Sequence, residues 1–207
     1  TTVSPTYAQE ILTPQYGEHL EMVLNIRKYD LWGITNGIDI EYWDPKNDPE
    51  IPYHYNKVNV KKAKGLNKEA LQKELGLNVD QNVLLIGVVS RLTWQKGFYL
   101  MMEKLSEICA MPIQLAVLGS GEASIEEKMA QLEAGNKGKI AFYKGYNDSL
   151  AHRIYGACDL FLMPSLFEPC GISQLISMRY GTLPLVRETG GLKDTVTPYN
   201  EFEKTGN

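Results

Sequence analysis

Short runs of hydrophobic residues recur along the chain from about residue 83 onward. They cover residues 83–89 (VLLIGVV), 113–119 (IQLAVLG), 139–145 (KIAFYKG), 159–165 (DLFLMPS) and 182–187 (TLPLVR). Runs that are apolar on both faces are typical of strands in a buried parallel sheet. We therefore predict one sheet strand for each run.

Stretches with hydrophobic residues at helical spacing lie between these runs. They cover residues 98–108, 124–134, 149–157 and 171–180. Strands that alternate with helices in this way predict an α/β domain with right-handed crossovers. We expect a Rossmann-like, doubly wound parallel sheet.

The first third of the chain has a different pattern. Residues 33–56 are rich in Asn, Asp and Pro, which predicts an irregular connector. Residues 67–77 (NKEALQKELGL) predict a capped helix that ends at Gly76. We place the independent domain at 44–207, and we expect residues 1–43 to be the tail of a preceding domain with its connector.

Composition narrows the class of protein. A length of 207 residues suits one domain, or one domain and a piece of another. The net charge of -4 argues against a nucleic-acid or membrane surface, because such a surface needs a basic patch. No apolar run is long enough to span a bilayer. The three cysteines show no paired spacing, which favours a reduced, intracellular protein.

Unusual loops follow each predicted strand. They are residues 90–97 (SRLTWQKG), 119–122 (GSGE), 145–148 (GYND), 164–171 (PSLFEPCG) and 187–194 (RETGGLKD). In an open parallel sheet, ligands bind outside the carboxyl ends of the strands. Because all five loops are expected at that one edge, they predict a binding site there more firmly than any single loop does.

Two cations and a helix start suggest an anion site at this edge. Arg91 and Lys96 could bind a diphosphate, Arg as a fork and Lys as a point charge. The alternative is a pair of solvated surface charges. The helix after EPCG is expected to begin near Gly171, and its free N–H groups, with the Ser173 hydroxyl, offer a second anion cradle.

Glu168, the two adjacent glycines and Tyr146 each allow two interpretations. Glu168 is either a helix-cap carboxylate or a ligand contact. Since a carboxylate would repel a neighbouring phosphate, a contact would be to a neutral polyol. Gly190 and Gly191 either permit close backbone approach to a ligand or form an ordinary turn. Tyr146 either stacks on a base or is a half-buried loop residue.

The remaining reactive side chains predict no further chemistry. The three histidines are scattered, so no metal site is expected, and His152 is interpreted as structural. Cys170 lies near a helix start but has no histidine pattern nearby, so we do not expect a nucleophile.

Four segments resemble those of bacterial glycogen synthases and plant starch synthases. They are VSPTYAQEI, GITNGIDIEYWDP, SRLTWQKG and FEPCGISQLISMRYGTLPLVRETGGLKDTV. The resemblance covers nearly the whole chain, and its last segment is highly specific. It implies the two-domain GT-B architecture and retaining transfer of glucose from ADP-glucose to the non-reducing end of an α-1,4-glucan. It also implies a cytoplasmic enzyme, or a plastid one in a plant.

The resemblance implies a role for each loop residue. Arg91 and Lys96 match the pair at the donor diphosphate, and Glu168 matches the glutamate that holds the transferred glucose. The other matches are Cys170 and Gly171 (backbone at the sugar), Ser173 (beside the phosphate, where many members have threonine) and Tyr146 (stacked on adenine). No metal or cofactor is implied, because the cations offset the charge of the departing ADP.

One position departs from related families. Those families have a second acid eight residues after the first, and that position here is Ile176. Only Glu168 can therefore be assigned.

The same resemblance implies that half of the active site lies elsewhere. The family's N-terminal domain carries a glycine-rich loop, an active-site histidine and most acceptor contacts. We expect the chain to be the donor-binding half, inactive alone.

Other functions stay open. The chain could be a non-catalytic nucleotide- or glucan-binding module, or part of a UDP-glucose-dependent transferase, since a tyrosine stacks on either base. A phosphorylase would need a lysine that anchors pyridoxal phosphate, which no loop presents convincingly, and a sucrose-type enzyme would be expected to show the second acid.

Overall fold

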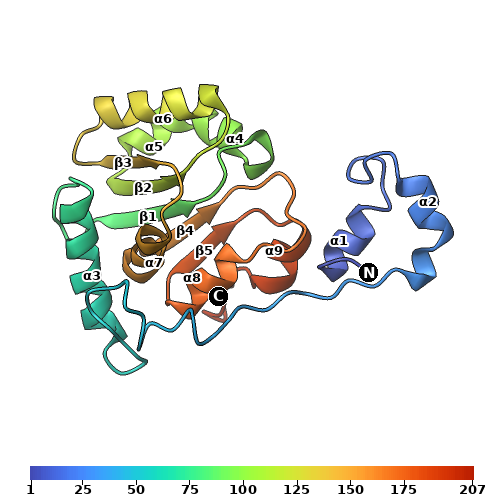
Figure 1. Ribbon diagram of the computed structural model, residues 1–207, viewed down its shortest axis with the longest axis horizontal. Helices are drawn as coiled ribbons and strands as arrows, with labels where there is room; N and C mark the ends of the chain where they lie inside the picture. The colour runs from blue at the N-terminus through green and yellow to red at the C-terminus, as the bar shows by residue number, and fades with distance from the viewer.

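A five-stranded, all-parallel sheet forms the centre of the molecule (Figure 1). The structure is a computed structural model that describes residues 1–207, apart from the side chain of Leu105. The strands are β1 (Leu84–Val89), β2 (Ile113–Gly119), β3 (Ile140–Lys144), β4 (Leu160–Met163) and β5 (Leu183–Val186). Their order, β3-β2-β1-β4-β5, reverses direction between β1 and β4. The predicted doubly wound α/β fold is confirmed, with each predicted strand in place.

Helices cover both faces of the sheet. One hydrophobic core lies between the sheet and α3 (Val60–Glu74), α7 (Asp148–Ala157), α8 (Ser173–Arg179) and α9 (Gly190–Thr195). The other lies under α4 (Phe98–Glu103), α5 (Leu105–Ala110) and α6 (Ala123–Gly135). Successive side chains of a strand point to opposite faces, so in β1 Leu85 enters the first core and Ile86 the second.

Two predicted helices differ from those observed. The stretch 98–108 forms α4 and α5 with a break at Lys104, which no glycine or proline explains. The helix predicted at 67–77 begins at Val60 and ends at Glu74, just before the predicted Gly76. Asn67 does not cap it: the Asn67 side-chain amide bonds both the N–H and the C=O of Tyr53, at 3.0 and 2.8 Å.

Residues 1–33 form a small N-terminal lobe at one end of the molecule (Figure 1). The lobe contains α1 (Pro5–Glu10), α2 (Glu21–Ile26) and the short 3₁₀ helix η1 (Lys28–Asp30). Ser4 caps α1, since its Oγ accepts from the N–H of Tyr7 at 2.8 Å, and Pro5 takes the first helical position. A parallel bridge between Thr2 and Gly33 closes the lobe.

Two carboxylates attach the lobe to the start and the end of α9. Glu10 Oε1 accepts from Thr189 Oγ1 at 3.0 Å and from the N–H of Gly190 at 2.9 Å. Asp194 accepts from the N–H and the hydroxyl of Thr6, at 3.0 and 2.5 Å. Desolvation would raise the pKa of Asp194, but the bonds from Thr6 and Ser4 outweigh it and lower this pKa.

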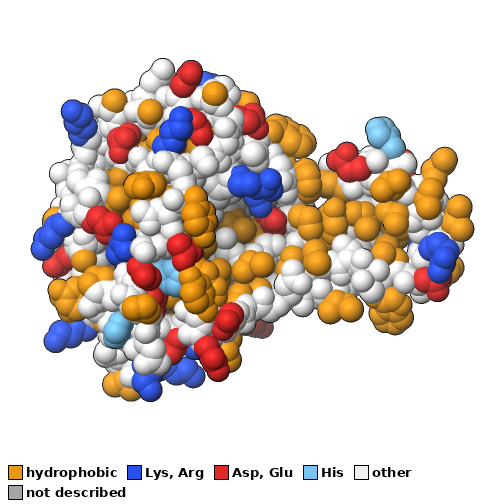
Figure 2. Space-filling view, in the orientation of Figure 1, with side chains coloured by type: hydrophobic (Ala, Val, Ile, Leu, Met, Phe, Trp, Pro, Cys, Tyr) orange, Lys and Arg blue, Asp and Glu red, His pale blue; other side chains and the backbone are white. Residues whose placement is uncertain are grey.

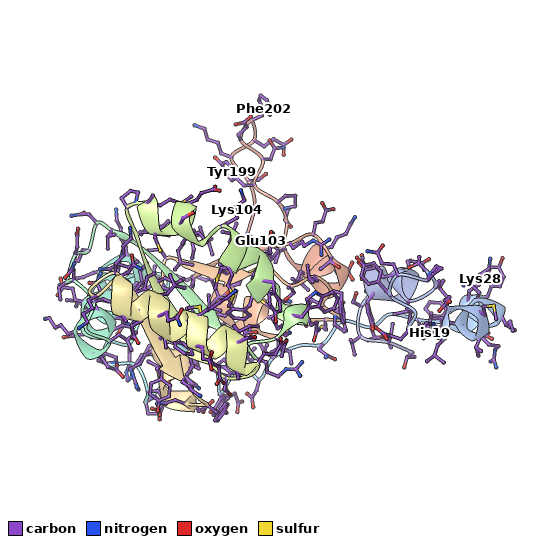
Figure 3. The ribbon with its side chains drawn as sticks, turned by 90° about the horizontal axis from the view of Figure 1, so that it is seen from above. His19, Lys28, Glu103, Lys104, Tyr199 and Phe202 are labelled. Carbon is purple, nitrogen blue, oxygen red and sulfur yellow. The ribbon has the colours of Figure 1, made fainter. Side chains whose placement is uncertain are left out.

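Hydrophobic side chains spread over the outer part of the lobe (Figure 2). Met22, Ile26 and Tyr29 are 76%, 80% and 85% exposed. Viewed from above, the lobe, marked by His19 and Lys28, and the segment around Tyr199 and Phe202 both project from the body of the molecule (Figure 3).

The connector after the lobe is anchored on α7. The Trp43 ring stacks on the buried imidazole of His152, with 4.1 Å between ring centroids. Asp48 Oδ2 lies 2.8 Å from His152 Nδ1 and accepts from the Tyr180 hydroxyl at 2.5 Å. His152 is therefore structural, as predicted.

Along the part of the chain that the structure describes, we find no helix with the length and hydrophobicity to cross a membrane.

Candidate functional site

Hydrogen bonds join the loops at the carboxyl edge of the sheet. The N–H of Leu166 donates to Gln95 O at 2.9 Å, and Gln95 Nε2 donates to Phe167 O at 3.2 Å. The N–H of Gly191 reaches Glu168 O at 3.0 Å. The N–H of Leu92 donates to Ser120 O, which joins the loops after β1 and β2, and the N–H of Gly145 donates to Gly119 O, which joins the loop after β3 to the end of β2. The five loops predicted to converge do meet at one edge.

Lys96 and Glu168 form an ion pair at the centre of this edge. Lys96 Nζ lies 2.6 Å from Glu168 Oε2, and the side chains are 17% and 7% exposed. The Ser165 hydroxyl donates to the same oxygen at 3.0 Å. Glu168 does not cap a helix, because Ile172 is the N-cap of α8. Lys96 and Ser165 therefore hold the Glu168 carboxylate in place at the edge of the sheet.

A pocket of about 200 Å³ opens beside this pair. Its polar lining comes from Ser90, Arg91, Lys96, Ser165 and Ser173, and its walls from the hydrophobic ends of β1 and β4. Arg91 is exposed, and its guanidinium contacts Gln95 Oε1 at 3.4 Å. Among the described residues, no carboxylate lies within ion-pair distance of Arg91. The pocket therefore carries an uncompensated positive charge.

The predicted helix start was two residues too early. α8 begins at Ser173, whose side chain lines the pocket, while Gly171 forms the preceding turn at φ +72°. The Gln174 side chain donates to Cys170 O and to Gly171 O, both at 3.1 Å. Cys170 is buried, so it and Gly171 shape the turn that presents α8 to the pocket.

Gly190 and Gly191 allow a close approach within the protein itself. A Cβ at Gly190 would lie 2.0 Å from Glu168 O, and one at Gly191 would lie 2.1 Å from Cys170 O. The two glycines therefore let α9 pack directly on the backbone of the Glu168 loop. The N–H of Gly190 is already bonded to Glu10.

Tyr146 lies outside the lining of this pocket. Its ring is 86% exposed, and its hydroxyl donates to Asp148 Oδ1 at 3.2 Å. That bond raises the pKa of Tyr146. The exposed ring is open to stacking, but no contact joins it to Arg91 or Lys96 among the described residues.

The structure adds three residues that the sequence analysis missed. Ser165 and Gln95 lie in the predicted loops, and a systematic search for side chains near Glu168 would have found them. Glu10 had no such signal, because only the fold brings α1 to the start of α9.

Within the described residues, no three His, Cys, Asp or Glu side chains gather as a metal site.

A comparison with models of protein families identifies the family of this chain. Residues 67–207 match the model described as "Glycosyl transferases group 1". The chain belongs to this family. Residues 1–26 match a second model, "Starch synthase catalytic domain".

The curated relatives of this glycosyltransferase chain are named glycogen synthases. The protein from Lachnospira eligens is 52% identical over 206 residues, which cover 100% of this chain and 43% of the relative. The protein from Geobacillus thermodenitrificans is 51% identical over 207 residues, which cover 100% of this chain and 42% of the relative. The chain thus spans less than half the length of these relatives.

Two solved structures have the same fold. The catalytic domain of starch synthase IV from Arabidopsis thaliana, described as bound to ADP and acarbose, matches with a TM-score of 0.89 and 38% identity. The match covers 97% of this chain and 41% of that chain. HepE from Anabaena, described as in complex with UDP and glucose, matches with a TM-score of 0.61 at 19% identity, which concerns the fold alone.

Proposed function

We propose that this chain is the donor-binding part of an ADP-glucose-dependent glycogen or starch synthase. The observation that carries the proposal is the basic pocket of Arg91 and Lys96 directly beside the buried carboxylate of Glu168. Glycogen synthases about half identical to the whole chain support it, as does the starch synthase described with bound ADP. The reaction is transfer of glucose to the non-reducing end of an α-1,4-glucan with retention.

The cations act on the leaving group. Arg91 and Lys96 offset the negative charge that develops on the departing diphosphate, and fixed charges are effective because they need no reorganisation. Ser173 and the unpaired N–H groups of the first turn of α8 add donors to the same group. These protein groups supply the charge stabilisation in the proposed reaction.

Glu168 holds the sugar. In the structure its carboxylate neutralises Lys96, so a diphosphate that binds Lys96 competes for this ammonium. The carboxylate, still fixed by Ser165, is then available to accept hydrogen bonds from the hydroxyl groups of the glucose. Glu168 thus orients the sugar so that the acceptor attacks from the face that the diphosphate leaves. The backbone of Cys170 and Gly171 borders the sugar, and α9 at Gly190 and Gly191 keeps this loop in position.

We assign residues 1–43 to the tail of an N-terminal domain and its connector, and 44–207 to the donor-binding domain. The two family models support this division, since one matches residues 1–26 and the other residues 67–207. The full-length protein then combines this chain with an N-terminal domain that completes the cleft. The three free thiols and the bacterial relatives favour the cytoplasm over a plastid.

Experiments can decide whether the protein catalyses the transfer and which nucleobase its donor carries. In the full-length protein, Arg91→Ala, Lys96→Ala and Glu168→Ala should each reduce turnover by orders of magnitude, on the order of 10²-fold or more. Near-normal glucan synthesis by all three variants contradicts the proposal. Titration with ADP-glucose and UDP-glucose separates the two donors, and the exposed Tyr146 ring is where a base would stack.

The 207-residue chain alone provides a second measurement. It should bind ADP weakly and make no glucan, because the acceptor side of the cleft is absent. Glucan synthesis by the purified chain contradicts this assignment. Failure of the full-length protein to turn over either donor favours the second candidate, a nucleotide- or glucan-binding module.

A further inference from the structure

The loops that form the basic pocket also help to form a second pocket, which is lined by aromatic rings. Its volume is about 260 Å³. The lobe and the loops after β1, β4 and β5 all contribute to its lining: Tyr7, Gln15, Tyr16, Glu18, Trp94, Leu166, Phe167 and Arg187. None of these residues has a part in the function proposed above.

The two pockets share their walls. The loop after β1 gives Arg91 and Lys96 to the basic pocket and Trp94 to the aromatic one. The loop after β4 likewise gives Ser165 to the first and Phe167 to the second. The bonds through Gln95 hold these loops together, and Phe167, which lines the aromatic pocket, directly precedes Glu168 in the chain.

The aromatic rings form one apolar surface of this pocket. Phe167 lies between Tyr16 and Trp94, with 6.3 Å between centroids on each side. Trp94 is 55% exposed, although burying such a ring would be favourable. An exposed tryptophan at the rim of a pocket is available to stack on a ligand.

Polar groups surround this apolar surface. Burial, together with the charges of Glu10 and Glu18, raises the pKa of Tyr7, so its hydroxyl keeps its proton and remains a donor. Gln15, Glu18 and Arg187 add an amide, a carboxylate and a guanidinium. Flat apolar faces with hydrogen-bonding groups at the edge match a pyranose ring, which has C–H faces and hydroxyl groups at its rim.

The backbone at the pocket is strained. Glu18 and His19 have φ values of +50° and +68°, a region that residues other than glycine rarely adopt. Such strain is found most often at functional sites, where the surrounding structure maintains it. Glu18 itself lines the pocket, and its carboxylate and the Arg187 guanidinium together give the lining no net charge that would select an anion.

We propose that the aromatic pocket binds a glucosyl unit of the α-glucan acceptor. This inference rests on the proposed function, because it takes the sugar held by Glu168 as the transferred glucose. The acceptor then extends from the neighbourhood of Glu168 over Phe167 and Trp94.

The test compares two exposed tryptophans in the full-length protein. Trp94→Ala should weaken maltohexaose binding about fivefold by calorimetry and raise the acceptor KM to the same extent, since stacking on one ring is worth ~1 kcal/mol. The affinity for ADP and the KM for ADP-glucose should stay unchanged. Trp32→Ala, with a ring 68% exposed and outside the pocket, is the matched control. Tyr16→Ala should repeat the loss from the lobe side.

The outcomes separate this inference from the proposed function. Failure of the unmodified protein to bind ADP overturns the proposed function. Unchanged maltohexaose binding in Trp94→Ala, or no maltohexaose binding by the unmodified protein, overturns the acceptor pocket alone. Equal losses of ADP and maltohexaose binding also overturn it, because the ring would then serve the donor site.

Discussion

The ammonium group of Lys96 and the carboxylate of Glu168 neutralise each other across two loops that lie 72 residues apart in the sequence. The pair therefore connects the carboxyl ends of β1 and β4, where the strand order reverses. The ammonium of Lys96 and the carboxylate of Glu168 stay paired until a ligand separates them.

The ion pair should make the two side chains depend on each other for stability. Lys96→Met alone should lower the free energy of unfolding by about 3 kcal/mol, because it leaves the buried Glu168 charge without a partner. The double variant Lys96→Met with Glu168→Gln should regain most of this loss while activity stays absent. Urea denaturation of four proteins measures the coupling: the unmodified protein, Lys96→Met, Glu168→Gln and the double variant.

The exposed pair Lys104–Glu107 is the control for this cycle. Its side chains are 60% and 61% exposed, so Lys104→Met should leave stability nearly unchanged. Additive losses in the Lys96 and Glu168 double variant would contradict the coupling.

Gly97 should be required for the position of Lys96. It has φ +75°, and a Cβ there would lie 2.0 Å from Pro164 O. Gly97→Ala should therefore weaken ADP binding and destabilise the fold by more than 2 kcal/mol, roughly, since left-handed strain and a backbone clash add up. Gly76→Ala is the matched control: its φ is +66° with open space around it, so only about 1 kcal/mol of strain is expected. Equal effects of the two variants on thermal unfolding would rule out the clash.

Glu10 should hold the lobe on α9. Glu10→Ala removes the acceptor of Thr189 Oγ1 and Gly190 N–H, and hydrogen bonds to a charged group contribute about 1.5–3 kcal/mol. Hydrogen exchange should increase in α1 and at the start of α9, whereas exchange in β1 and β2 stays slow. An increase that reaches every strand equally would show global destabilisation instead.

Asp48 should give the fold a defined sensitivity to acid. Burial would raise the pKa of Asp48, but the hydrogen bonds from His152 and Tyr180 outweigh it and lower this pKa below the ordinary 3.8. A lowered folded-state pKa contributes stability above pH 3.8, and this contribution is lost as the pH falls through the folded-state value. Asp48→Asn should cost about 2 kcal/mol at pH 7 and progressively less below pH 4, roughly.

The control for this prediction is Asp30→Asn. Asp30 pairs with Arg27 in the open, and its side chain is 64% exposed, so little change is expected at any pH. A difference between Asp48→Asn and the unmodified protein that stays constant from pH 7 to about pH 3 would contradict the assignment.

The sequence could predict the sheet and the edge at which the site lies, because both follow from local patterns. Five apolar runs gave five strands, and the loops after them had to meet once the sheet was parallel. Arg91, Lys96 and Glu168 were found together in this way.

What the sequence could not predict depends on contacts between distant parts of the chain. The Asn67 amide resembles a helix cap but bonds Tyr53 instead, and Glu10 reaches α9 only through the fold. The sequence likewise gives no sign that Lys96 pairs with Glu168, because the resemblance assigns Lys96 to the diphosphate and Glu168 to the glucose. The ligand roles of all the candidate site residues stay predictions: Arg91, Lys96, Tyr146, Glu168, Cys170, Gly171, Ser173, Gly190 and Gly191.

The connector between the lobe and Trp43 has a mechanical consequence. Residues 35–37 are exposed, and a Cβ at Gly37 would have no neighbour within 4 Å, whereas Trp43 is fixed on His152. This short tether limits how far the lobe can travel, while the bonds of Glu10 and Asp194 to its two contact points set where it rests. Because α1 also packs on α9, and α9 packs on the backbone of the Glu168 loop, one short helix joins the lobe to the edge of the sheet where the candidate site lies.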